Sequence, residues 1–216
     1  VDLVANELDL DPADVRLKNM IQPEQMPYNV GLPYRDGVII EYDGGDYPKA
    51  LRMALEDLGG LADFRSRQKQ ALEKGSYLGL GIGCYVEGTG IGPFEGATVK
   101  IDSSGKIFVK TGACPQGQGH ETTFAQVAAD LWGVPIEDVF VTLADTAQVT
   151  MGYGTMASRS AVTASGAIQS SSAKLQDKVL RIAAHVLEVP EADLEFRDGK
   201  VSVKGVAELS ITLKEI

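Results

Sequence analysis

The sequence is short of positive charge and has no long apolar run, and both shortages exclude classes of protein. No apolar run approaches the ~20 residues that a helix needs to cross a bilayer, so the sequence predicts no membrane span. Lys and Arg number 20 against 30 Asp and Glu, which gives a net charge of −10. Because this charge repels phosphates, nucleic acid and anionic membranes are not expected as partners, although local backbone N–H groups can still bind an anionic cofactor.

Cysteine and histidine are equally scarce, with two residues of each: Cys84, Cys114, His120 and His185. Four such residues are enough for one zinc site, but the sequence has neither a Cys-x-x-Cys pair nor a closely spaced His pair. A disulfide would need an oxidising compartment, and nothing marks the chain as secreted. We therefore expect two free thiols, a cytoplasmic protein and no set of metal ligands.

What is present is ordinary globular composition, with 44% hydrophobic and 23% charged residues in a chain of 216. This length allows one domain or two small ones with a substantial core. The chain begins at Val1 inside a helical pattern, without an initiator methionine or a signal-like segment. We expect an internal piece of a longer polypeptide.

The local patterns divide the chain at residue 75. Residues 1–75 predict helices around a Pro- and Gly-rich crossing segment, and residues 76–216 predict an α+β portion. Alternating glycine and apolar residues over 79–90 are typical of a strand packed against close backbone. The other predicted elements are helices at 1–9, 12–20, 46–60, 61–74, 119–132 and 161–188, strands at 38–42 and 137–145, and hairpins turning at 103–106 and 198–199.

A faint internal repeat supports a duplicated architecture. AADLWGVPIEDVFV (128–141) and AAHVLEVPEADLEF (183–196) share a helix, a Val-Pro pair, an Asp and a strand. VANELDLDPADVRL (4–17) echoes them with one residue fewer between its Pro and its Asp. Helix–turn–strand units without a fixed period favour an α+β fold over a solenoid.

The stretch ACPQGQGHETTFAQ (113–126) contains a glycine-bearing loop directly before a predicted helix. This loop, residues 115–119, is called loop one. Its composition gives up side-chain packing for access to the backbone. Gly117 and Gly119 permit positive φ and close approach, and the helix start offers free N–H donors. The amide of Gln118 can donate and accept at once, which suits a heteroaromatic ring or an oxo group. A tight connection with a solvated Gln118 is the structural alternative.

The second glycine-bearing loop, GYGTMASRS (152–160, loop two), also precedes a helix. Arg159 at a helix start is unfavourable against the helix dipole unless an anion pairs with it. The alternatives are an exposed surface residue or a structural salt bridge. Two similar loops together favour a shared anionic ligand.

Two other patterns carry little weight. Cys114 and His120 could form a nucleophile–base pair, but no third orienting residue is evident. The run GLGIG (79–83) lacks the third glycine and the following helix of a dinucleotide fingerprint.

Five segments together resemble the molybdenum-cofactor-binding large subunit of the xanthine oxidase/aldehyde oxidase family, most closely the carbon monoxide dehydrogenase large chains and their relatives. They cover nearly the whole chain: DPADVRLKNMIQPEQMPY (11–28), YDGGDYPKAL (42–51), GLGIGCYVEGTGIGPFEGATVKI (79–101), GACPQGQGHETTFAQVAADLWGVPIEDVFVTLADT (112–146) and GYGTMASRSAVTASGA (152–167). The resemblance implies an α+β fold with mixed sheets, part of that family's duplicated cofactor-binding domain.

The resemblance also implies site residues and partners. It implies cofactor contacts to molybdopterin, as the cytosine dinucleotide, at Gln116, Gly117, Gln118, Gly119, Thr155, Ser158, Arg159, Ser160 and Ala161. It places Tyr85, Glu87 and Gly88 near the substrate funnel. The implied reaction is hydroxylation of an aldehyde, an N-heterocycle or a similar small molecule with oxygen from water. Electrons would pass to iron–sulfur and FAD groups on other subunits or domains.

The sequence departs from the family in what it lacks. The downstream glutamate motif that supplies the base, an upstream glycine loop and the loop that distinguishes carbon monoxide enzymes do not occur here. We therefore expect no catalytic residue within these 216 residues and an inactive isolated chain. A structural or assembly module and a nucleotide-phosphate binding domain remain as alternatives.

Overall fold

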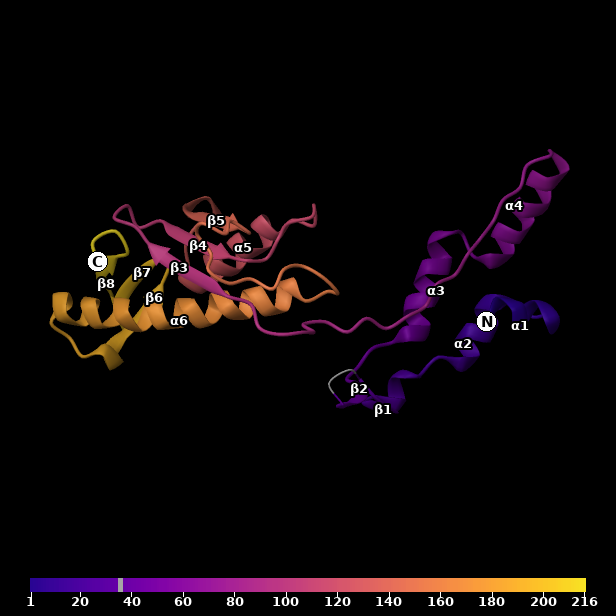
Figure 1. Cartoon of the computed structure of the whole chain (residues 1–216), viewed down its shortest axis with the longest axis horizontal. Coiled ribbons are helices and arrows are strands. Elements are labelled where there is room, and N and C mark those ends of the chain that lie inside the picture. The colour runs from indigo at the N-terminus through magenta and orange to yellow at the C-terminus, as the bar shows by residue number, and fades with distance from the viewer. Residues whose placement is uncertain (35–36) are drawn as a thin grey trace. The chain divides into compact units, whose positions relative to one another are not determined.

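The structure is a computed structural model that describes residues 1–34 and 37–216 (Figure 1). It groups the chain into two compact units, Val1–Val86 and Glu87–Ile216. Residues 76–86 therefore group with the first unit, while the division after residue 75 stays a prediction about domains. Among the described residues no helix is long and apolar enough to cross a membrane.

The first unit consists of short helices and one hairpin. Its helices begin at the residues that the sequence indicates: the Asp11 carboxylate accepts a hydrogen bond from Ala13 N at 2.8 Å, and that of Asp46 accepts from Lys49 N at 2.9 Å. Proline fills the first turn after each cap. The elements are α1 (Asp2–Glu7), α2 (Pro12–Asn19), the 3₁₀ helix η1 (Pro23–Gln25), β1 (Tyr28–Pro33), β2 (Ile39–Tyr42), α3 (Tyr47–Asp57) and α4 (Leu61–Glu73).

Two predictions for this part of the chain are wrong. The crossing segment has two antiparallel strands and not one, because β1 pairs with β2 from Tyr28↔Tyr42 to Pro33↔Ile39. The sequence did not predict β1 because proline and glycine, which this segment contains, have a low propensity for strands. The alternating run at 79–90 is not assigned as a strand; a strand needs a partner, and none of the described residues pairs with it in a ladder.

The second unit contains two three-stranded sheets and two helices. In the first sheet β3 (Ala97–Ile101) pairs antiparallel with β4 (Ile107–Thr111), and β4 pairs parallel with β5 (Val139–Leu143) through the crossover helix α5 (His120–Trp132). The helix α6 (Ser160–Leu187) runs along β3 and on to the second sheet (Figure 1). That sheet is antiparallel and comprises β6 (Leu194–Arg197), β7 (Lys200–Val203) and β8 (Val206–Thr212).

One core joins these elements. Along β4 the side chains of Ile107, Val109 and Thr111 are buried, and they alternate with half-buried ones, as expected for a strand covered on one face. Trp132 is buried at the end of α5 and donates from Nε1 to Ser172 Oγ of α6 at 3.1 Å. The α+β class is thus confirmed, with the two hairpins and both long helices at their predicted places, whereas β8 was not predicted.

The internal repeat is visible as a repeated turn. After α5, Val134 N donates to Ala129 O at 3.1 Å, and after α6, Val189 N donates to Ala184 O at the same distance. Each turn continues through a short 3₁₀ helix, η2 (Ile136–Asp138) or η3 (Glu191–Asp193), into a strand. The echo at 4–17 shares the turn but leads into α2 and not into a strand.

Candidate functional site

Three chain segments meet at one edge of the first sheet. Since β3 is antiparallel to β4 and β4 parallel to β5, this edge holds the start of β3 and the carboxyl ends of the other two strands. A Cβ on Gly112 would lie 2.2 Å from Gly152 Cα, and a Cβ on Gly96 would lie 3.1 Å from Met151 O. The backbones that lead into loop one, loop two and β3 are therefore in direct contact. In open parallel α/β sheets, ligands bind outside the carboxyl ends of the strands, and β4 and β5 form a parallel pair whose carboxyl ends lie at this edge.

Loop one is open to solvent. Residues 114–119 are exposed, and Gly117 and Gly119 have φ of +100° and +79°, with nothing within 4 Å of a Cβ built on either. Gln118 folds back, so that its Oε1 accepts from Gln116 N at 2.6 Å. The acceptor half of its amide is thus occupied within the loop, which leaves the Nε2 group as the half that can donate to a ligand.

Unpartnered polar atoms lie at both ends of loop one. Thr111 Oγ1 and His120 Nδ1 are the buried side-chain nitrogen and oxygen atoms without a hydrogen-bond partner among the described residues. Such groups are rare in native proteins because each costs the full desolvation of a polar atom. Both atoms are therefore open to an additional polar partner near loop one.

Loop two has a turn of unusual backbone conformation. Ala157 and Ser158 have φ of +47° and +56°, and the helical residue Arg159 follows as the N-cap of α6. Left-handed residues followed by a right-handed one turn successive N–H groups toward one side, which makes a concavity suited to an anion. Ser160 Oγ donates to Thr155 Oγ1 at 3.0 Å, and this bond closes the loop against the helix start.

Arg159 is almost completely buried, with 1% of the residue exposed. Its guanidinium makes an ion pair with Glu95, whose side chain is fully buried. Five hydrogen bonds leave the guanidinium, to Glu95 Oε2 at 3.0 Å and to the carbonyl oxygens of Ile91 at 3.1 Å, Phe94 at 3.1 Å, Gly154 at 2.7 Å and Pro93. Of the alternatives that the sequence left open, the structure shows the structural salt bridge and not the exposed surface residue, whereas the predicted contact with the cofactor stays a prediction.

The predicted funnel residues fall on both sides of the division between the units. Tyr85 belongs to the first unit and is exposed. Glu87 and Gly88 begin the second unit, where Ser158 Oγ lies 3.5 Å from Glu87 Oε1 and Gly90 N donates to Ser158 O at 3.2 Å. The chain at 87–90 therefore lies against loop two.

Asp145 shapes the connection between β5 and loop two. Its carboxylate accepts from Gln148 Nε2 at 2.5 Å and from Ala147 N at 2.9 Å. The hydrogen bond from the Gln148 side chain, followed by that from the Ala147 backbone, lowers the pKa of the Asp145 carboxyl. The ionised carboxylate is thus part of the turn.

Cys114 and His120 do not form a catalytic pair in the described structure. Cys114 is exposed and its Sγ lies 3.8 Å from Pro115 O, whereas His120 is buried with its ring 5.2 Å from that of Phe124. The described residues also contain no group of three or more His, Cys, Asp or Glu side chains arranged to hold a metal ion.

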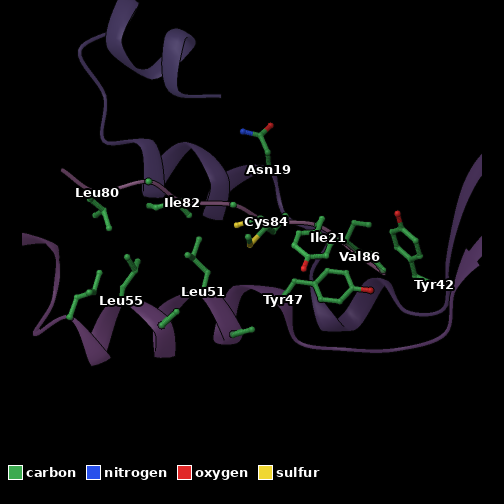
Figure 2. Close-up of a pocket in the computed structure, with 17 residues that line it drawn as sticks. Asn19, Ile21, Tyr42, Tyr47, Leu51, Leu55, Leu80, Ile82, Cys84 and Val86 are labelled. Atoms are coloured by element: carbon green, nitrogen blue, oxygen red, sulfur yellow. The ribbon is translucent and has the colours of Figure 1, made fainter. Parts of the chain in front are cut away.

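A cavity of about 560 Å³ lies elsewhere, in the first unit. Figure 2 shows Leu51 and Leu55 of α3 facing the extended segment with Leu80, Ile82 and Cys84. The lining is mainly apolar and includes none of the loop residues. We therefore place the candidate site at the two loops, where open backbone and unpartnered polar atoms occur together.

Reasoning from the sequence missed Glu95 and the contact between Gly112 and Gly152. The carboxylate lies 64 residues from Arg159, and only the tertiary fold brings the two together. The glycines offered a faint indication, since Gly152 is the first residue of loop two and Gly112 comes shortly before loop one.

Comparison with known proteins identifies the family of the chain. A family model described as "Molybdopterin cofactor-binding domain" matches residues 54–216. Similar proteins include the carbon monoxide dehydrogenase large chain of Afipia carboxidovorans, 37% identical over all of this chain and 28% of that protein. The nicotine 6-hydroxylase large subunit of Paenarthrobacter nicotinovorans is 32% identical over all of this chain and 27% of that protein.

Solved structures give the same result. CO dehydrogenase from Oligotropha carboxidovorans matches with a TM-score of 0.76 and 37% identity, over 99% of this chain and 28% of that one. Quinoline 2-oxidoreductase from Pseudomonas putida 86 matches with a TM-score of 0.78 and 36% identity over the same shares. The chain spans little more than a quarter of the length of these relatives. It belongs to the molybdopterin cofactor-binding domain family.

Proposed function

We propose that these residues form part of the cofactor site of a molybdenum hydroxylase, with loops one and two on the molybdopterin. The observation that carries the proposal is the backbone contact of Gly112 with Gly152, which brings two open loops to the carboxyl ends of β4 and β5. The family match supports this function over a structural module or a nucleotide-phosphate domain.

The donors available at the loops suit a large anionic pterin. In loop one we propose contacts from Gln116, Gly117, Gln118 and Gly119, where backbone is open and the Gln118 Nε2 group can donate. In loop two we propose contacts from Thr155, Ser158, Ser160 and Ala161, where the left-handed turn and the start of α6 present N–H groups and hydroxyls. A helix start also favours negative charge electrostatically.

The cytosine dinucleotide form of the cofactor is part of the proposal. Its additional phosphate and base would need more donors than one loop offers, and two loops at one edge supply them. The unpartnered Thr111 Oγ1 and His120 Nδ1 are available for a polar group of this ligand or for another part of the protein.

The bound molybdenum centre would supply two-electron oxidation of an electron-poor carbon with oxygen derived from water. The residues of this chain bind and orient the cofactor, and we propose that Tyr85, Glu87 and Gly88 lie along the path of the substrate. An aldehyde or an N-heterocycle is the proposed substrate class. The base, the iron–sulfur and FAD groups and the rest of the pocket belong to other parts of a cytoplasmic complex.

The test uses the full-length protein from cells that make the cofactor. Elemental analysis and mass spectrometry of the released pterin should find molybdenum together with a cytosine nucleotide. A bound nucleotide without molybdenum would favour the nucleotide-phosphate domain. Absence of both would favour the structural module.

A further inference from the structure

We propose that the buried pair of Glu95 and Arg159 is a positioning device for the cofactor site, and that Arg159 acts through loop two without contacting the cofactor. The proposal rests on the proposed function of the loops and assigns to Glu95 a part in it. It also changes the role that the sequence implied for Arg159.

The first argument is that the guanidinium is saturated. Arginine has five N–H donors, and the five hydrogen bonds of Arg159 go to protein oxygens. The ring of Tyr153 covers the guanidinium, with the Arg159 carbon Cζ 5.2 Å from the ring centroid. A phosphate could gain a bond from this side chain only by displacing one of these partners.

The second argument is the position of the acceptors. Four of the five belong to the segment 91–95, and the fifth is the Gly154 carbonyl inside loop two. The Glu95 carboxylate adds bonds from Tyr153 N, at 3.2 Å to Oε1, and from Gly96 N at 3.3 Å. The pair thus fastens loop two to the chain just before β3.

The third argument is that the fastened turn is strained. Ala157 and Ser158 both lie in the left-handed region, which non-glycine residues occupy at a cost. Such conformations persist when the surroundings hold them. Arg159 follows them directly, so its anchorage and the Gly90 N to Ser158 O bond hold the C-terminal end of the turn.

The two roles of Arg159 predict opposite results for Glu95→Gln. If Arg159 bound the cofactor, loss of the competing carboxylate would free a donor, and retention of the cofactor would stay equal or improve. If the pair positions loop two, Glu95→Gln weakens retention in the same direction as Arg159→Met, because a buried charge loses its partner. The full-length holoenzyme is the material for this test.

We expect both single variants to release molybdenum at least about tenfold faster than the wild type, since breaking a buried pair is strongly unfavourable. Arg159→Lys should not restore retention, because a lysine ammonium cannot reach five acceptors in a planar arrangement. The double variant Glu95→Met/Arg159→Met should lose no more than the worse single variant, because the two residues act as one unit. Arg197→Met, at an exposed arginine of the same unit, is the matched control and should match the wild type.

Hydrogen exchange of the cofactor-free full-length protein gives a readout that does not depend on activity. Amides over 153–158 should exchange at least about tenfold faster in Glu95→Gln than in the wild type or in Arg197→Met. Equal or slower molybdenum release in Glu95→Gln, or unchanged exchange in this segment, would overturn the positioning role. If the wild type holds no molybdenum, the proposed function fails, and the exchange measurement alone still decides whether the pair orders loop two.

Discussion

The two glycine loops follow the same order of strand, loop and helix, yet they are held in different ways. Loop one is exposed, and the side-chain contact within it is the bond from Gln116 N to Gln118 Oε1. Loop two is joined to the rest of its unit through a buried ion pair and three carbonyl oxygens, and a fourth carbonyl, that of Gly154, belongs to the loop itself. One loop depends on glycine conformation, and the other depends on side chains far away in the sequence.

This difference suggests separate roles for side chains that would contact a ligand and side chains that hold a loop in place. In loop one a side chain can be changed with little effect on the fold, because residues 114–119 are exposed. In loop two the residue at the helix start, Arg159, is buried, so a change there should alter the loop and its proposed ligand contacts together. Similar sequence patterns therefore carry different amounts of structural constraint.

The largest effect is expected at the contact that the loops share. Gly112→Ala would place a Cβ 2.2 Å from Gly152 Cα, a clash that only movement of the backbone can relieve. Overpacking costs roughly 1–3 kcal/mol and occasionally more, and we expect the upper end because both neighbours are main chain. Soluble yield and molybdenum content of the full-length protein should fall, with faster hydrogen exchange in both loops.

Gly166→Ala is the matched control. This glycine is exposed within α6, and nothing lies within 4 Å of a Cβ at that position. Alanine in a helix is favoured over glycine by about 0.5–1 kcal/mol, so the thermal midpoint should stay equal or rise. A harmless Gly112→Ala would show that the loops are not in contact in the protein.

Much of the fold could be predicted because its signals are local. Caps at Asp11 and Asp46, the turn at 198–199 and the apolar alternation of β4 each depend on a few neighbouring residues. β8 was not predicted because no Asn-Gly or Asp-Gly pair, the usual signal of a hairpin turn, directly precedes it. The run at 79–90 has the alternation of a strand, but pairing depends on a partner that the pattern does not name.

The candidate site shows the same limit more sharply. Gln118 and Gly119 were identified from their position before a helix, and the resemblance to a family added the pterin. Glu95 could not be found in this way, since nothing in FEGATVKI (94–101) marks a carboxylate as the partner of Arg159. The position of Arg159 at a helix start predicted an anionic partner, and the structure shows that the Glu95 carboxylate of the same chain is such a partner.

The second prediction concerns loop one. Gln118→Ala should leave the thermal midpoint unchanged because the side chain is exposed. It should remove one hydrogen bond to the cofactor, worth about 1–3 kcal/mol if a partner is left unpaired. Turnover or cofactor retention in the full-length protein should then fall by roughly ten- to a hundredfold. Gly117→Val should have a larger effect, because φ is +100° there and a β-branched residue resists it.

If loop one only connects β4 to α5 and does not bind the cofactor, the two variants should behave differently. Gln118→Ala would then change neither turnover nor molybdenum content, and Gly117→Val would lower only the thermal midpoint. Molybdenum content, thermal midpoint and turnover of both variants distinguish the two cases. Full activity with full metal loading in Gln118→Ala would remove loop one from the cofactor site.

A smaller effect is expected at Glu87, which touches loop two from the side of the proposed substrate path. Its contact with Ser158 Oγ is long, at 3.5 Å, and both side chains are exposed. Glu87→Gln should keep molybdenum content and change KM or the preference among aldehydes and N-heterocycles. Unchanged kinetics with every substrate tested would exclude Glu87 from the path, whereas loss of molybdenum would make it part of the loop two support.

The smallest effect concerns Asp145, on the connection from β5 to loop two. Bonds from Gln148 and Ala147 lower the pKa of this carboxyl in the folded protein. A lowered pKa means that the ionised form stabilises the turn at pH values above the ordinary aspartate range, near 4, and that this contribution disappears as the pH falls through the folded-state pKa. The amide resonance of Ala147, followed by NMR, should therefore shift with a midpoint below that of an ordinary aspartate. Asp145→Asn should abolish the shift and leave the amides of loop one unchanged. A midpoint at or above the ordinary value would show that the carboxylate does not hold the turn between β5 and loop two.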